Sequence, residues 1–75
     1  MAPEPNKLVI CLDNTGTEAS LERRKIYVAL PDPTAGPLGL LRVIDESGED
    51  YLYPAGQFID AELPAGVANA VLRVA

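Results

Sequence analysis

The chain has 75 residues, 48% of them hydrophobic, and a net charge of −5. A chain of this length forms one small domain with little room for an enclosed substrate pocket, and its composition is that of a folded domain. The negative charge argues against nucleic-acid binding, which depends on Lys and Arg. No apolar run is long enough for a membrane-spanning helix, and the first residues lack the features of a secretion signal. The sequence therefore predicts a soluble, cytoplasmic protein.

The chain is expected to begin with a flexible tail, residues 1–6, followed by a strand. The stretch "KLVICLD", residues 7–13, is apolar at both alternating sets of positions, which is typical of a strand covered on both faces. Cys11 is the only cysteine, so no internal disulfide can form. We expect Cys11 to be a small buried hydrophobic residue.

A polar loop and a second strand come next. "DNTGTEAS" contains Asn14 and Gly16, a pair suited to a turn, and "KIYVAL", residues 25–30, has the alternation of a strand. A helix over residues 17–25 is the competing interpretation, because its residue types favour helix. That segment offers little apolar surface to bury, so the loop is favoured.

The middle of the chain predicts a hairpin. "PDPTAGPLG", residues 31–39, is a loop because its three prolines lack backbone donors. "LLRVID", residues 40–45, and "DYLYP", residues 50–54, then read as paired strands joined by "ESGE". Gly48 suits the left-handed position of the turn, and Ser47 can bond neighbouring amides. We expect the carboxylates of this turn to face water.

The last segment, residues 63–75, predicts a short helix that packs on the strands. Pro64 suits the first turn of a helix, and Val67, Val71 and Val74 fall at helical spacing. If the helix detaches, the same apolar stripe becomes a binding or dimerising surface.

The order of residues in "DYLYPAGQFI" resembles the end of a Src-homology-3 barrel. Tyr53 and Pro54 are followed by a single expected helical turn over residues 55–57, then Phe58 and a short last strand. The resemblance covers residues 7–62 and implies a mainly β fold, a small five-stranded Src-homology-3-like barrel with a short C-terminal helix. The run "RKIYVALPD…GLLRVIDESGEDYLYP" also resembles a group of short uncharacterised bacterial proteins.

The same resemblance argues against binding of proline-rich ligands. Proteins of this fold bind such ligands in an aromatic groove that includes a tryptophan. Here the corresponding stretches read "ICLDN" and "LLRV", and the chain has no Trp.

The side chains available do not support enzymatic chemistry. The chain has no His, one Cys, no nucleophile elbow and no phosphate-binding glycine loop. Asp45 and Asp50 could face each other across the hairpin, but an exposed turn does not separate the pKa values of two carboxylates. The spacing of an EF-hand calcium loop is absent. We expect no catalytic residue, no cofactor and no metal ligand.

The sequence predicts a non-catalytic, acidic protein-interaction module that meets a basic or mixed surface on another protein. Tyr51 and Tyr53 lie two apart on one strand and share a face, either as exposed contacts or partly in the core with their hydroxyls at its rim. The candidate surface consists of Asp45, Glu46, Glu49, Asp50, Tyr51 and Tyr53.

Two other functions stay open at this point. The first is a divalent-cation or small-ligand sensor that uses the acidic turn. The second is a small nucleic-acid-binding barrel that uses the basic cluster Arg23, Arg24 and Lys25. The sequence does not determine an oligomeric state.

Overall fold

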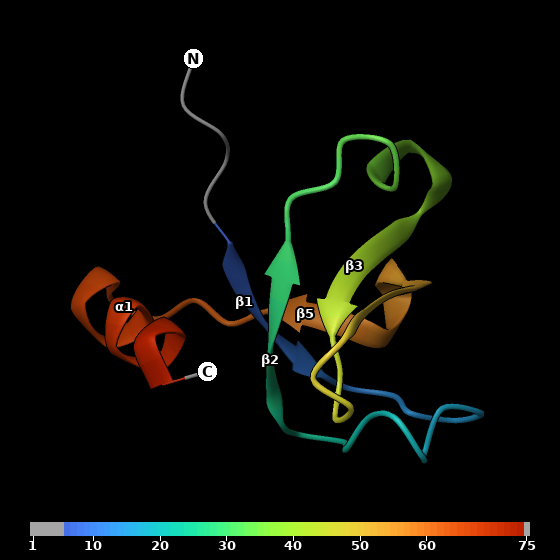
Figure 1. The fold of residues 1–75 in the computed structure, drawn as a ribbon, viewed down its shortest axis with the longest axis horizontal. Helices are drawn as coiled ribbons and strands as arrows, with labels where there is room; N and C mark the ends of the chain where they lie inside the picture. Colours follow the sequence, from blue (N-terminus) through green and yellow to red (C-terminus); the bar gives the residue numbers. More distant parts are fainter. Residues whose placement is uncertain (1–5, 75) are drawn as a thin grey trace.

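Five antiparallel strands curl into a half-barrel, and one short helix follows them (Figure 1). The computed structural model describes residues 6–74, so the predicted tail lies outside the described residues except for Asn6. The mainly β prediction is confirmed: the strands expected over residues 7–13, 25–30 and 40–45 are each one or two residues shorter, and the strand over residues 50–54 has the predicted bounds. The elements are β1 (Lys7–Cys11), β2 (Ile26–Leu30), the 3₁₀ turn η1 (Gly36–Leu38), β3 (Leu40–Ile44), β4 (Asp50–Pro54), the 3₁₀ turn η2 (Ala55–Gln57), β5 (Phe58–Asp60) and α1 (Ala65–Val74).

The strand order is β4-β3-β2-β1-β5, so β4 and β5 form the two edges of the sheet. The first four strands form a meander, in which each strand pairs with the next along the chain. β5 then returns to pair with β1, where Ile59 lies opposite Ile10. The edges meet across the core through side chains. The rings of Tyr53 and Phe58 lie 6.2 Å apart in an edge-to-face arrangement, which is a favourable geometry for two aromatic rings.

The core lies on the concave face of the curled sheet. Alternate residues of each strand point into it, as the period of two requires. Cys11 is fully buried there, and this burial raises the pKa of its thiol, as expected for an inert apolar position. The core cluster consists of Val9, Cys11, Leu21, Tyr27, Ala29, Val43, Tyr53 and Phe58.

The long loop between β1 and β2 contains no helix, so the helical alternative for residues 17–25 is wrong. One helical turn forms, in which the backbone N–H of Leu21 donates to the carbonyl of Thr17 at 2.9 Å. The chain then turns away because Leu21 is fully buried in the core, and its carbonyl accepts from the side-chain amide of Asn14 at 3.0 Å. Burying one leucine in the core therefore decides the path of the loop.

The helix α1 lies to one side of the sheet, beyond β1 (Figure 1). Its half-buried residues, Ala68, Val71 and Leu72, share one stripe, whereas Val67 is exposed. The Val74 side chain lies outside the described part of the chain. Within residues 6–74, no helix is long and apolar enough to cross a membrane.

Two residues on the convex face of the sheet are also buried. Leu8 and Val28 alternate with core residues and lie opposite each other on β1 and β2, outside the core cluster. Burial on this face requires a cover. Packing of the C-terminal helix on the strands stays a prediction, and a helix lying on this face would account for both the buried pair and the half-buried stripe of α1.

Candidate functional site

The acidic stretch between β3 and β4 forms a tight hairpin turn, as predicted. The N–H of Gly48 donates to the carbonyl of Asp45 at 3.0 Å, and the N–H of Asp45 donates to the carbonyl of Glu49 at 3.1 Å. Gly48 has a φ of 83°, in the left-handed region where a side chain would be strained. Ser47 Oγ accepts from the Glu49 amide at 3.2 Å, which confirms its expected role in the turn.

The Asp45 carboxylate points inward, which corrects the expectation that every carboxylate of the turn faces water. Asp45 is only 7% exposed. Its Oδ1 accepts from the amide N of Ser47 at 2.8 Å and from Ser47 Oγ at 2.5 Å, and its Oδ2 accepts from the hydroxyl of Tyr53 at 2.6 Å. These bonds, that of the Ser47 hydroxyl first, hold the pKa of Asp45 below its ordinary value. The hydrogen bonds stabilise the ionised carboxylate of Asp45 in its buried position. Asp45 therefore has a structural role in the hairpin.

The Glu46 carboxylate fastens the turn to the long loop. It accepts from Lys25 Nζ at 2.6 and 2.9 Å and from the hydroxyl of Tyr27 at 2.5 Å. The Glu46 amide also donates to the carbonyl of Ser20 at 3.0 Å, and the Tyr27 hydroxyl accepts from the Glu22 amide at 2.6 Å. The bond from Lys25 lowers the pKa of Glu46, whereas burial and the bond to Glu46 raise the pKa of Tyr27. The turn and the loop are therefore joined by charge-assisted hydrogen bonds.

The remaining predicted residues lie on the outside. Tyr51 is 49% exposed, and its hydroxyl donates to Glu49 Oε2 at 2.8 Å. Asp50 Oδ2 accepts from Arg42 Nη1 at 3.0 Å, while Arg42 Nε donates to Asp32 Oδ2 at 2.9 Å. The hydrogen bond from Arg42, followed by that from the Ala35 amide, lowers the pKa of Asp32. Part of the negative charge on this side of the molecule is thus compensated by Arg42 and Lys25.

The six candidate residues therefore divide into two groups. Asp45 and Tyr53, the latter 8% exposed, are buried and support the turn from within, so they add no exposed area to a binding surface. The other four reach the outside: Glu46 is bound to Lys25 and Tyr27, whereas Glu49, Asp50 and Tyr51 lie together at the β4 edge of the sheet.

The sequence reasoning missed Leu52 as a site residue. Leu52 is 43% exposed and lies beside Tyr51 on the edge strand β4. The alternation in "DYLYP" carries the signal, because it places Leu52 on the face opposite to the two tyrosines. An exposed apolar side chain on an edge strand is a candidate contact for a partner protein.

A groove of about 320 Å³ runs along the same strand. One wall comes from the long loop at Ser20 and the other from β4, so the two segments that Glu46 joins also shape the hollow. Its lining residues are Ser20, Asp45, Ser47, Tyr51, Leu52 and Tyr53. We call the exposed part of this region, Glu49, Asp50, Tyr51 and Leu52, the β4 edge surface.

The geometry does not favour cation binding or acid–base chemistry at the turn. Asp45 turns toward Ser47 and Tyr53, whereas Asp50 turns toward Arg42, so the two carboxylates do not share a site. Among the residues that the structure describes, no three His, Cys, Asp or Glu side chains gather where they could hold a metal ion. The cation-sensor hypothesis stays a prediction without support from these contacts.

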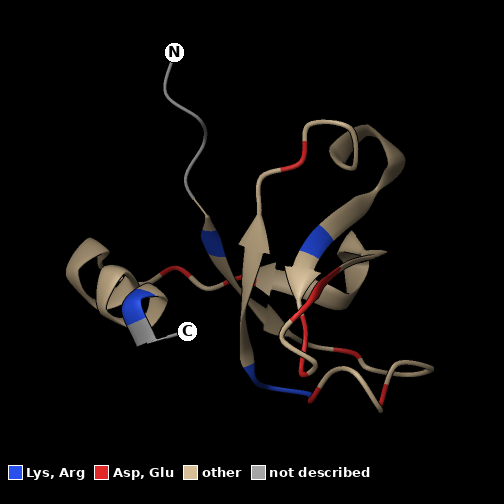
Figure 2. Ribbon diagram, viewed as in Figure 1, with Lys and Arg blue, Asp and Glu red and all other residues tan. Residues whose placement is uncertain are grey.

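The basic cluster is not a continuous positive surface. Lys25 is engaged by Glu46 at 2.6 Å and lies 3.7 Å from Glu22. Figure 2 shows the basic segment of residues 23–25 close to acidic residues at the same end of the molecule. Nucleic-acid binding through this cluster likewise stays a prediction that the geometry does not favour.

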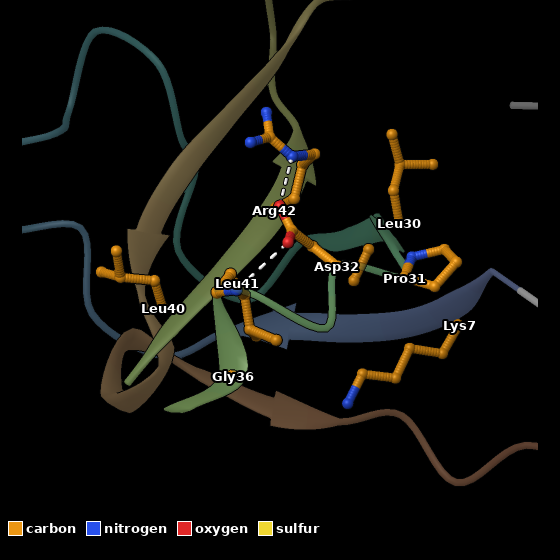
Figure 3. Close-up of a pocket in the computed structure, with 10 residues that line it drawn as sticks. Lys7, Leu30, Pro31, Asp32, Gly36, Leu40, Leu41 and Arg42 are labelled. Atoms are coloured by element: carbon orange, nitrogen blue, oxygen red, sulfur yellow. Dashed lines mark hydrogen bonds and ion pairs between the residues drawn. The ribbon is translucent and has the colours of Figure 1, made fainter. Parts of the chain in front are cut away.

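A second hollow, of about 190 Å³, lies where the β2–β3 loop meets the ends of β1 and β3 (Figure 3). Its lining is mostly apolar, and Arg42 and Asp32 form their ion pair at its rim. Lys7 lies on the other side and pairs with Asp60 at 3.2 Å. Each charged group that lines this hollow is thus already in an ion pair.

Comparison with known proteins adds no assignment to this geometry. No protein-family model, no curated protein and no solved structure matches the chain.

Proposed function

We propose that this chain is a non-catalytic, acidic protein-interaction module and that the β4 edge surface is where it meets its partner. The observation that carries the proposal is the pair Tyr51 and Leu52, 49% and 43% exposed, which are consecutive on an edge strand next to a groove and present their side chains on its two faces. Tyrosine supplies a large contact area at low entropic cost and is frequent among residues that dominate binding energy.

The expected partner carries a basic or mixed surface. The chain has a net charge of −5, and the exposed acids Glu49 and Asp50 directly precede Tyr51 in the hairpin. Complementary charge of this kind chiefly speeds the encounter of two proteins, and salt weakens it. Association should therefore slow as ionic strength rises.

The test is capture of partners from a lysate on immobilised protein, with surface variants beside the unchanged chain. The variants are Tyr51→Ser with Leu52→Ser, and separately Glu49→Gln with Asp50→Asn. Asp45 and Tyr53 are left intact because their replacement would disturb the fold. A partner of this surface should be lost with the first pair and weakened with the second.

A matched control carries the same kinds of change on the other edge of the sheet. Ile59→Ser with Asp60→Asn replaces an exposed apolar residue and an exposed acid on β5. Proteins that bind the control, are lost with the Tyr51 and Leu52 variant and bind more weakly to the Glu49 and Asp50 variant support the proposal. Equal capture by all forms, or no specific capture by the unchanged chain, would contradict it.

We also propose that the curled sheet is a Src-homology-3-like barrel. The support is the order of elements after the hairpin: β4 ends at Pro54, the single turn η2 follows, and β5 begins at Phe58 and returns to β1. This is the order that the sequence resemblance implies. Membership in a bacterial group and a cytoplasmic location stay predictions.

A further inference from the structure

We propose that the partner is bound as an extended segment that adds a strand to the free edge of β4. This inference rests on the proposed function and specifies how the partner would be held. The contacts of an added strand are main-chain hydrogen bonds, while side chains on the two faces decide which segment fits.

The pairing of β3 with β4 shows which backbone groups are free. The N–H of Asp45 donates to the carbonyl of Glu49, and the N–H of Ala55 donates to the carbonyl of Gly39. Between these two bonded pairs, Val43 lies opposite Tyr51. In an antiparallel pair, alternate residues turn their N–H and C=O toward the partner strand. The backbone N–H and C=O groups of the odd-numbered residues of β4 therefore bond to β3. The N–H and C=O groups of Asp50 and Leu52 point away from β3.

The unpaired backbone groups of Asp50 and Leu52 lie on the same strand as the exposed side chains of Tyr51 and Leu52. In the described part of the chain, no other strand pairs with the outer edge of β4. An added strand would lie between Tyr51, on the groove side, and Leu52, on the convex side. Pro54 has no N–H, so the pairing would extend over Asp50 and Leu52 and stop there.

The register predicts the composition of the added segment. Running antiparallel to β4, it would place an apolar residue opposite Leu52, then a residue against Tyr51, then a basic residue opposite Asp50. Cross-strand pairs of this kind, apolar with apolar and opposite charges together, stabilise a sheet. We therefore commit to an extended segment of another protein in which an apolar residue precedes a basic one by two positions.

A second copy of this chain fits the edge less well. Two copies each carry a charge of −5, and an antiparallel pair of β4 edges would bring two sets of Glu49 and Asp50 to one interface. Each would also contribute a proline without a donor. Charge complementarity thus favours a basic partner over self-association.

The experiment uses peptides selected from a random peptide library on the immobilised full chain. The best binder is then measured against the chain made by chemical synthesis with an N-methyl group on the Leu52 amide. The methyl group removes the free donor and leaves the Leu52 side chain unchanged. We expect binding to weaken about tenfold or more, the effect of losing a buried hydrogen bond. The matched control is N-methylation of Asp60, whose amide by the same reasoning points away from β1 on the other edge.

Amide hydrogen exchange gives a second readout that does not depend on the modified chain. In the complex, exchange at the Asp50 and Leu52 amides should slow at least about tenfold, because these N–H groups become hydrogen-bonded. Unchanged exchange at both amides, or full affinity after Leu52 N-methylation, overturns strand addition. A dimer of the chain alone that N-methylation of Leu52 dissolves also overturns it, since the occupant would then be a second copy.

The two proposals can fail separately. If Tyr51→Ser abolishes peptide binding but N-methylation of Leu52 does not, the interaction surface stands and strand addition is wrong. If neither change affects binding, the surface itself is wrong.

Discussion

At Asp45, three hydrogen bonds converge on one carboxylate, from the amide and hydroxyl of Ser47 and from the hydroxyl of Tyr53. A buried charge costs free energy unless such bonds replace its hydration. The Tyr53 hydroxyl in turn donates its hydrogen to Asp45, so each group helps to make the burial of the other tolerable. The acid therefore belongs to the core of the hairpin, although its neighbours in sequence are exposed.

Replacing this carboxylate tests its structural role. Asp45→Asn keeps the size of the side chain but removes the charge, and it should lower the free energy of unfolding by about 1–3 kcal/mol. The control Asp60→Asn removes an exposed acid that forms a surface ion pair with Lys7, and it should leave stability nearly unchanged. Urea denaturation of both variants measures the difference. Equal stability of the two variants would contradict the role of Asp45.

Among the elements, the strands and the hairpin turn were predictable because each is encoded locally. The alternation in "KIYVAL" and Gly48 in its left-handed conformation depend on few distant contacts. Asp45 was not predictable in this way, because only the fold brings the Tyr53 hydroxyl to it. Tyr51 and Tyr53 share a face, as predicted, yet only Tyr53 reaches Phe58 in the core, while Tyr51 lies nearer the turn and stays exposed.

The long loop illustrates the same limit. Leu21 lies in a polar segment, and its burial depends on a core cluster to which residues of all five strands contribute. The residue types of this segment favour helix, but tertiary contacts override such weak preferences. For the candidate site, the exposed acids and Tyr51 were identified from the sequence, whereas the groove and the free edge required the strand order.

The helix α1 provides a prediction at the level of elements. If it docks through its half-buried stripe, Leu72→Ala should lower the free energy of unfolding by about 1 kcal/mol, from lost apolar burial. Alanine is the best helix former, so a loss cannot come from helix propensity. Val67→Ala, at an exposed position of the same helix, is the control and should be neutral or slightly stabilising. Thermal unfolding monitored by circular dichroism distinguishes the two, and a neutral Leu72→Ala would show that the helix is not docked.

For the whole molecule, the paired tyrosines and carboxylates predict a decline in stability at both ends of the pH scale. The pKa values of Asp45 and Glu46 lie below their ordinary values of 3.8 and 4.5, so the stability they contribute is present above those values and is lost as pH falls. Burial raises the pKa values of Tyr27 and Tyr53 above 10.0, so their contribution is present below pH 10.0 and is lost as pH rises further.

Urea midpoints measured across the acidic and alkaline ranges test this dependence. Tyr27→Phe should reduce the slope on both sides, because it removes a tyrosine that titrates and one hydrogen bond to Glu46. An identical pH profile for the variant and the unchanged chain would show that this pair does not link protonation to folding.

The two edges of the sheet are unequal, and this inequality bears on assembly. β5 spans three residues between η2 and a segment leading to Pro64, whereas β4 spans five and ends in Pro54. Short edges and edge prolines are devices by which natural sheets limit further pairing. A molecule with two equivalent edges would template copies end to end and grow into a fibre. If only the β4 edge can pair, and Pro54 limits that pairing, the sheet would gain a single added strand. The product would be a discrete complex of one chain with one bound segment.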